Sequence, residues 1–266
     1  RAVGSSFHAA ALTMPTSTLK TAPDGVALAS ICIGLLGYLA FRLLEHRRPS
    51  ADCPQREEVQ VLECIRQRRS VFPRSYTDKT VEPQQVQLLL DAAMWAPFHG
   101  PRPPWRFVVL GRNSVLEMQK LTLEFYKKNW QEVWAEDERG AEKAYQTWRQ
   151  KAEEDINNRW APVSYMIAII MRRQAGSKRM PEWEEAAATA CAVQNMHIQA
   201  SASPGLACYW SSWHSKARDS REMHEFLGMG SEDKCFGFFI VAACDGALDD
   251  KRSRSPDVHM AVDWRE

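Results

Sequence analysis

Two consecutive arginines and a serine, Arg68, Arg69 and Ser70, form the first segment that could do chemistry. Guanidinium groups beside a hydroxyl suit a phosphate, or an electron-rich heterocycle that carries carbonyl oxygens. Two arginines at the end of a helix also complement the helix dipole without binding any ligand. The residue types alone therefore leave both interpretations open.

The second candidate segment is a proline-rich loop over residues 96–104, which is followed by Trp105. Its prolines restrict the backbone, and Gly100 permits a close approach to it. A single histidine in a loop is commonly a surface residue. The rigid turn and the neighbouring aromatic rings favour a binding role for His99.

The third candidate segment is Trp210, Ser211, Ser212 and Trp213, at the end of a predicted strand. Successive hydroxyls and main-chain amides at a strand end can bind a phosphate or a ring oxygen. The alternative is a simple turn in which a serine hydroxyl bonds to the backbone as the chain leaves the sheet.

The composition is that of an ordinary globular protein. The chain has 266 residues, 45% of them hydrophobic, and a net charge of +1. Binding to nucleic acid through bulk charge needs a basic surplus, so no nucleic-acid partner is expected. Seven scattered cysteines without a C-x-x-C pair argue against a disulfide scaffold or a zinc ribbon. The sequence also lacks H-E-x-x-H, G-x-S-x-G and a phosphate loop, so neither a metal ligand nor a catalytic residue is predicted.

A membrane anchor is predicted near the start of the chain, over residues 25–44. Residues 25–41 are seventeen in succession without a charge, and Arg42, Arg47 and Arg48 follow as a basic flank. A buried core helix or a cleaved signal sequence would show a similar run. Residues 45–54 are expected to be a linker that leads to the globular domain.

Residues 1–24 are expected to be a leader or tail. Residues 1–23 contain no acidic residue and are rich in Ser, Thr and Ala, which resembles an organellar targeting segment. A disordered tail has a similar composition. With the anchor, this predicts a single-pass protein of a mitochondrial or chloroplast membrane, whose domain lies on the matrix or stroma side.

Residues 55–266 are predicted to form an α+β domain, because helices alternate irregularly with short strands. The expected helices cover residues 56–69, 82–96, 113–137, 139–158, 181–203 and 219–227, and the expected strands cover 105–110, 163–171, 206–210 and 234–243. The helix at 181–203 is expected to pack tightly through one stripe of mostly small residues, Ala186, Ala190, Val193, His197 and Ala200.

Taken together, the candidate segments resemble the flavin-dependent nitroreductase family, particularly its compact bacterial members. The resemblance covers about residues 55–260 and rests on five ordered blocks: Arg68-Arg69-Ser70, Ala96-Pro97-Phe98-His99, Pro104-Trp105, Pro181-Glu182-Trp183-Glu184 and Trp210-Ser211-Ser212. In addition, residues 234–238 match the family's final core strand.

The resemblance implies an α+β homodimer with FMN in a groove between the subunits. Arg68, Arg69 and Ser70 would hold the flavin and its phosphate, and His99 would contact the flavin of the other subunit. Trp210, Ser211 and Ser212 would line the same site. NAD(P)H would pass a hydride to the flavin, which then reduces a small acceptor such as a quinone or a nitroaromatic compound.

Some positions depart from the family pattern. Trp95, a candidate cofactor-binding position, stands where compact members have a basic residue, and Phe72 and Pro73 replace another basic position. Lys251, Arg252 and Arg254 could supply phosphate contacts, or form an exposed charge run. A redox-weakened or inactive accessory subunit of an organellar membrane complex is therefore an alternative to the enzyme. A membrane-anchored reductive dehalogenase of the iodotyrosine type ranks third, because residues 113–160 lack that group's acid–Tyr–Lys signature.

Overall fold

The computed structural model describes residues 61–176, 179–245 and 262–265. The predicted leader, anchor and linker over residues 1–54, and the basic residues at 251–254, lie outside this part of the chain. No helix in the described ranges combines the length and the apolar character needed to cross a membrane.

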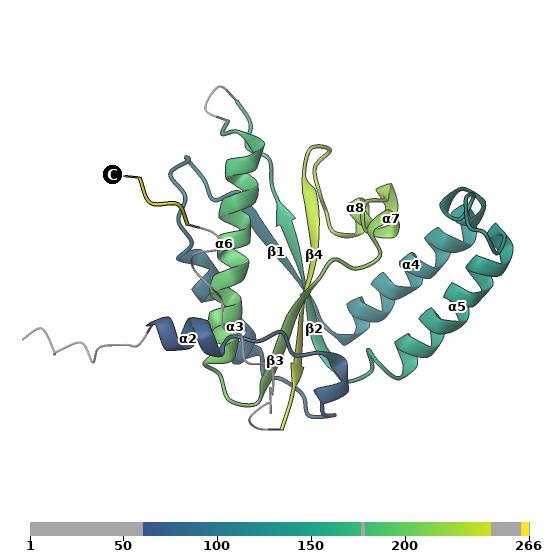
Figure 1. Ribbon diagram of the computed structural model, residues 1–266, viewed down its shortest axis with the longest axis horizontal. Helices are drawn as coiled ribbons and strands as arrows, with labels where there is room; N and C mark the ends of the chain where they lie inside the picture. Colours follow the sequence, from purple (N-terminus) through teal and green to yellow (C-terminus); the bar gives the residue numbers. More distant parts are fainter. Residues whose placement is uncertain (1–60, 177–178, 246–261, 266) are drawn as a thin grey trace, which may run out of the picture. The chain divides into compact units, whose positions relative to one another are not determined.

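The described chain contains one sheet with helices on both faces (Figure 1). The helices are α2 (Val61–Gln67), η1 (Pro73–Ser75), α3 (Pro83–Met94), α4 (Arg112–Val133), α5 (Ala141–Asn157), α6 (Glu182–Ser201), α7 (Ser215–Arg218) and α8 (Arg221–Phe226). The strands are β1 (Trp105–Leu110), β2 (Val163–Met171), β3 (Leu206–Ser211) and β4 (Lys234–Ala243). The α+β prediction is confirmed.

The four strands follow the order β1-β2-β4-β3, and every neighbouring pair is antiparallel. β3 forms one edge of this sheet, and the segment that follows α2 runs beside it. The Val71 amide donates to the Cys208 carbonyl at 3.0 Å, and Tyr76 forms an isolated bridge with Cys244. These two contacts bring the residues after α2 next to β3 and to the end of β4, although more than 130 positions separate the residues of each pair.

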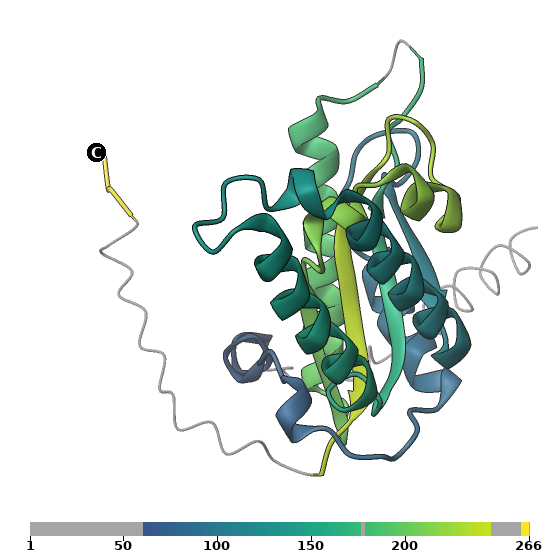
Figure 2. The same cartoon turned by 90° about the vertical axis from the view of Figure 1, so that its right-hand side faces the viewer.

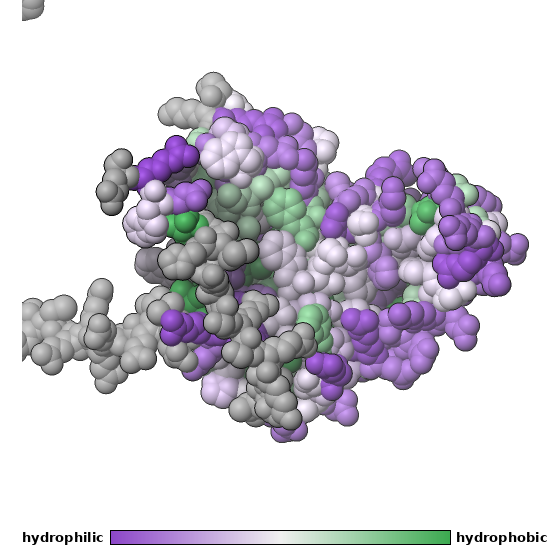
Figure 3. All heavy atoms as spheres, viewed as in Figure 1, coloured by the Kyte–Doolittle hydropathy of each residue, from purple (hydrophilic) through white to green (hydrophobic). Residues whose placement is uncertain are grey.

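The two faces of the sheet carry different helices (Figures 1 and 2). Side chains alternate along a strand, so Ile167 and Ile169 face α3 and α6, whereas Met166 and Ile170 face α4. The outer surface of the α4–α5 hairpin is largely hydrophilic (Figure 3). Its apolar side chains pack either against the sheet or in a cluster shared by α4, α5 and α7, as expected for amphipathic helices.

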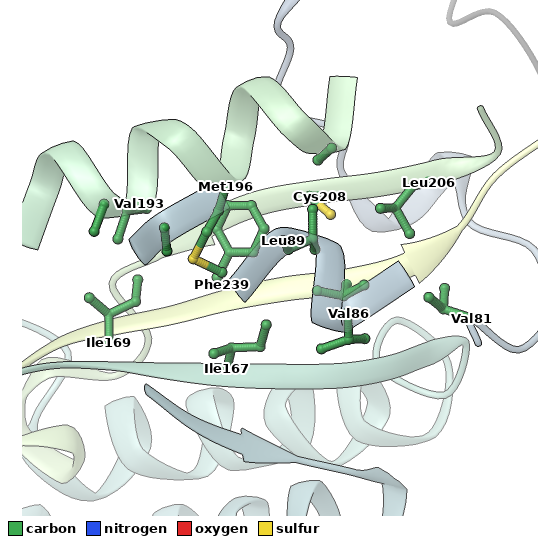
Figure 4. Close-up of a cluster of buried hydrophobic side chains, with 14 of the residues drawn as sticks. Val81, Val86, Leu89, Ile167, Ile169, Val193, Met196, Leu206, Cys208 and Phe239 are labelled. Carbon is green, nitrogen blue, oxygen red and sulfur yellow. The ribbon is translucent and has the colours of Figure 1, made fainter. Parts of the chain in front are cut away.

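The face covered by α3 and α6 is densely packed. Leu89 of α3 and Met196 of α6 are fully buried against Phe239 of β4 (Figure 4). The predicted stripe on α6 was partly wrong in its angular position. Val193, His197 and Ala200 are buried as expected, but Ala186 and Ala190 are only half-buried, and the other buried residues of the helix are Glu185, Ala188, Thr189, Ala192 and Met196.

The start of α6 is anchored by a buried ion pair. Arg173, just after β2, contacts the carboxylate of Glu185, whose side chain has no exposed surface. The backbone N–H of Gln174 donates to the same carboxylate at 3.4 Å. Removing one partner of such a pair leaves an uncompensated buried charge, so the two residues fix the position of α6 against the sheet.

His197 of α6 is buried and electrically neutral in the folded protein. Its ring meets Phe239 edge-on, with ring centroids 4.9 Å apart, and 7% of the residue is exposed. Burial lowers the pKa of His197 to about 4, and the positive charge of Arg68 adds to this effect. The backbone of Cys208 hydrogen-bonds to the ring and opposes part of the shift.

We predict that His197 makes the protein less stable in mild acid. A histidine with a depressed pKa contributes stability above its unfolded value, near 6.5, and that stability is lost as the pH falls toward 4. At pH 5 the loss amounts to roughly 2 kcal/mol. Urea unfolding of His197→Gln should therefore show a stability difference between pH 7 and pH 5 that is smaller than in the wild type by about this amount. An unchanged difference would contradict the assignment.

Candidate functional site

A cavity of about 490 Å³ lies on the α4–α5 side of the sheet. Its wall is formed by the segment after α2, the end of β3, and the facing sides of α4 and α5. The lining residues are Ser70, Phe72, Gln119, Thr122, Leu123, Trp148, Lys151, Ala152, Asp155, Ile156, Arg159, Trp160, Tyr209, Trp210, Ser211, Ser212, Trp213 and His214. Four predicted site residues, one after α2 and three at the end of β3, therefore meet here.

Ser70 reaches the cavity because the chain after α2 follows β3. The backbone bond between Val71 and Cys208 holds this segment in place. Phe72 then packs on Tyr209, with ring centroids 5.0 Å apart. The hydroxyl of Ser70 and the phenol of Tyr209 thus belong to one wall of the cavity.

The end of β3 turns sharply at the cavity. The Trp213 amide donates to the Ser211 hydroxyl at 3.2 Å, which is the local turn that the sequence left as an alternative. Trp213 has a φ of +58°, an uncommon conformation for a large side chain. The Ser212 carbonyl accepts from the Arg218 guanidinium at 3.1 Å. Hydrogen bonds within the protein therefore stabilise this turn, and Ser211 and Ser212 also line the cavity.

Because Gly237 of β4 has no side chain, it leaves room for the backbone at the end of β3. Its φ is +105°, and a Cβ at this position would lie 2.1 Å from the Ser211 carbonyl oxygen. The pairing of β2 with β4 is irregular at this point, between Phe238 and Cys235. A bulge with a glycine is a common way to bend a strand beside a functional site.

Aromatic rings enclose much of the cavity. Trp213 lies 5.4 Å from Trp160 between ring centroids, and its indole N–H donates to Thr122 of α4 at 3.0 Å. Trp148 of α5 meets the His214 ring edge-on at 5.4 Å. Such surfaces can stack on a planar ring and exclude water from it.

Charged groups stand at one side of the cavity, on α5 and just after it. Lys151 and Arg159 are positive, and Asp155 is negative and 3.8 Å from Arg159. The Arg159 guanidinium also lies over the Trp160 ring at 4.9 Å. The net local charge is positive, which favours an anionic ligand.

Two lining residues are held in their neutral forms. Burial raises the pKa of the Tyr209 phenol, and the nearby Arg159 charge opposes this shift. Burial also lowers the pKa of His214, against the influence of Asp155. At pH 7 the phenol and the imidazole therefore offer neutral hydrogen-bonding groups rather than charges.

Arg68 and Arg69 flank Ser70 in sequence but do not line the cavity. The Arg69 guanidinium donates to the carbonyl of Arg66 and, at 3.0 Å, to the carbonyl of Arg68. This arrangement is the helix-terminal role that the sequence left open. Arg68 lies close enough to His197 to influence its pKa.

Trp95 and His99 also lie away from the cavity. Trp95 is 86% exposed and borders a separate groove between α3 and α6, together with Leu88 and Asn195. His99 is exposed on its loop, with Nε2 3.5 Å from a carboxylate oxygen of Glu184. Within one chain, the structure therefore does not bring these two residues together with Ser70 and the end of β3.

Sequence reasoning missed the contribution of α4 and α5. Both helices were expected, but Gln119, Lys151 and Arg159 were not assigned to a site. A signal was present on α4, where Gln119 and Thr122 interrupt an apolar stripe that contains Val115 and Met118. Polar residues on the inner stripe of a helix are candidates for a ligand-facing role.

The fold and the cavity define an α+β protein with a cofactor-sized site beside an edge strand. The nitroreductase family model matches residues 65–243, which is more than half of the chain. The protein therefore belongs to the nitroreductase family.

Solved structures share this fold at low sequence identity. A nitroreductase-like family protein from Bacillus cereus is 23% identical, with a TM-score of 0.59, over 77% of this chain and 96% of that one. A nitroreductase with bound FMN from Bacteroides fragilis is 19% identical, with a TM-score of 0.53, over 78% and 99%. An FMN and NADPH-dependent nitroreductase from Sphigopyxis sp. strain HMH is 17% identical, with a TM-score of 0.56, over 78% and 100%.

A shorter match links the chain to a curated relative. It is 38% identical over 60 residues to a protein of Methanothermobacter thermautotrophicus that is named for NADH dehydrogenase and NAD(P)H nitroreductase activity. The match spans 23% of this chain and 30% of the relative's length.

We predict that Gly237→Ala disrupts the end of β3. The added methyl group meets the Ser211 carbonyl, and the backbone conformation is strained for alanine, so the unfolding free energy should fall by about 2–3 kcal/mol. Gly111→Ala is the matched control, because a methyl group added there would have no neighbouring atom within 4 Å and its φ is −77°. Urea unfolding should show a change of less than about 1 kcal/mol for this control. Equal losses in both variants would argue against the close approach.

Proposed function

We propose that the protein is an FMN-dependent NAD(P)H oxidoreductase that reduces a quinone, a nitro compound or a similar small acceptor. The observation that carries this proposal is the cavity in which Ser70 and the strand end Trp210–Ser212 meet. Membership of the nitroreductase family supports it. So do the solved relatives that are described with FMN.

The residues around the cavity fit a flavin nucleotide. A volume of about 490 Å³ lies within the range of about 300–1,000 Å³ that small-molecule and cofactor sites occupy. The serine hydroxyls can donate to ribityl or phosphate oxygens, and the indole and phenol rings can stack on a planar heterocycle. The positive charges of Lys151 and Arg159 suit a phosphate.

The chain's own residues would bind and orient the cofactor. Ser70, Ser211 and Ser212 would hold its polar groups, with Arg68 and Arg69 adjoining in sequence. Trp160 and Trp213 would exclude water from the ring. The chemistry that the flavin supplies when bound is hydride exchange between NAD(P)H and the acceptor.

A second subunit would complete the site in this proposal. Trp95 and His99 lie away from the cavity of their own chain, and Trp95, Leu88 and Met94 are large, exposed apolar residues on or beside α3. Exposed apolar side chains on one element are typical of a surface that another protein covers. We therefore propose a homodimer in which this loop and helix face the partner's cofactor.

Membrane attachment is a separate proposal that rests on the sequence. The uncharged run at residues 25–41 and its basic flank support a single-pass anchor. The acid-poor leader supports a mitochondrial or chloroplast membrane, with the domain in the matrix or stroma. Fractionation of the full chain tests this. Retention in the membrane after alkaline carbonate extraction is expected, and release without detergent would contradict it.

The direct test of the proposed function is the visible spectrum of the purified full chain. We expect a yellow protein that releases FMN on denaturation and oxidises NADPH in the presence of a quinone or nitroaromatic acceptor. A colourless protein that binds no added FMN and co-purifies stoichiometrically with a membrane assembly would contradict this proposal and support the accessory-subunit alternative.

Substitutions should then locate the cofactor. Ser70→Ala should weaken FMN binding by about 3- to 10-fold, because a neutral hydrogen bond contributes roughly 1 kcal/mol. Arg68→Ala should weaken it by about 10- to 100-fold, because we propose that its guanidinium contacts the phosphate. Arg69→Ala should have the smaller effect of the two arginine variants, since its guanidinium bonds to the end of α2.

Fluorescence titration with FMN measures these constants. Ser231→Ala, in an exposed turn that does not line the cavity, is the matched control for the serine variant and should bind FMN as the wild type does. If Ser70→Ala and both arginine variants bind FMN with wild-type affinity, the cofactor is not held by this segment.

A further inference from the structure

Gln119 of α4 is buried in the cavity wall without a hydrogen-bond partner at either end of its amide. The residue is 2% exposed, and neither Oε1 nor Nε2 has a partner within the described ranges. Six residues in these ranges have buried side-chain atoms without a partner, and of these Gln119 is the one that lines the cavity. An unmatched buried amide costs stability, so its presence needs an explanation.

The neighbours of Gln119 offer it no partner. Thr122, one turn further along α4, donates its hydroxyl hydrogen to the Met118 carbonyl and accepts the Trp213 indole N–H, each at 3.0 Å. Ile156 of the adjacent α5 and Trp160, just after that helix, are apolar residues of the same wall. Gln119 lies between the main cavity and a smaller hollow of about 180 Å³, and it lines both. Arg112 and Asn157 also line the smaller hollow, but neither forms a hydrogen bond with the Gln119 amide.

The two unmatched atoms specify the chemistry of a ligand. A carboxamide places one acceptor and one donor side by side, so its complement is a group with an adjacent N–H and C=O. Quinones and nitro groups carry acceptors only, and they would leave Oε1 of Gln119 unmatched. The pyrimidine ring of a flavin and the carboxamide of a nicotinamide both carry the required pair. Trp160 beside Gln119 offers a surface for a flat ring.

We propose that Gln119 is a recognition residue that pairs with the amide or imide edge of a planar heteroaromatic ligand in this cavity. This rests on the proposed flavin- and nicotinamide-dependent function, and it adds a ring-recognising residue on α4. The ligand's edge then lies between α4 and α5, which run side by side over the sheet (Figure 2). A site that hydrogen-bonds a ligand N–H strongly rejects an analogue without it.

The test compares ligands that differ only at this N–H. One pair is FMN and its N3-methyl derivative; the other is NADP⁺ and its 3-acetylpyridine analogue, which keeps the carbonyl and loses the amide N–H. Dissociation constants are measured for the wild type and for Gln119→Leu, with FMN-loaded protein for the nicotinamide pair. For one of the two ligand pairs, we expect the wild type to bind the natural ligand at least 10-fold more tightly than its analogue. Gln119→Leu should bind that natural ligand less than about 3-fold more tightly than the analogue. The pair that shows this loss identifies the flavin or the nicotinamide as the source of the edge.

Three control measurements make the result interpretable. Gln119→Leu should melt at the wild-type temperature or above, because it removes two unmatched buried atoms. Gln119→Met, whose side chain is similar in length to that of glutamine, should lose the preference for the natural ligand as Gln119→Leu does. Gln131→Leu, on the exposed side of the same helix, should keep the wild-type preference.

The experiment distinguishes failure of the proposed function from failure of the inference about Gln119. If the wild type binds neither FMN nor NADP⁺, the proposed function fails and this inference fails with it. If the wild type binds them and Gln119→Leu retains the full preference in both pairs, Gln119 contacts only water, and this inference alone is overturned.

Discussion

The close approach of β4 to the end of β3 is the constraint on which the candidate site depends. A side chain at Gly237 would overlap the Ser211 carbonyl, so the bulge in β4 determines where β3 can end. From there, Trp213 turns the chain and bonds to Thr122 of α4. One backbone contact thus relates the strand end, the serine hydroxyls and the helix that forms the opposite wall.

The two faces of the sheet differ in how completely they are filled. Between the sheet and α3 and α6, small residues such as Ala192 let the backbones approach closely, and the apolar side chains fill the space. Between the sheet and α4 and α5 lies a cavity of about 490 Å³ that is lined in part by Trp148, Trp160 and Trp213. Both faces bury apolar side chains, but the face covered by α4 and α5 also carries polar groups and a cavity.

The sequence predicts the elements well and the site only in part. β1, β2 and β4 have the predicted limits, because their runs of apolar and β-branched residues end at loop-forming residues. Ser70 and Trp210–Ser212 could be placed together through the family resemblance. The buried pair of Arg173 and Glu185 could not be foreseen, since both residues look like ordinary surface charges along the chain. The angular position of α6 could not be foreseen either, because a helix of small residues has a weak apolar stripe.

The same reasoning explains why α4 carries the least predictable part of the site. Its stripe of Val115, Met118, Thr122 and Tyr126 determines which side faces the sheet, and Gln119 is carried inward with them. Leucine at this position would pack without any unmatched atom, and each unmatched amide group costs about 1–3 kcal/mol. A domain that retains such a residue gives up stability at one point of its core. Because that point borders the cavity where the predicted residues meet, ligand recognition accounts for the cost better than packing does.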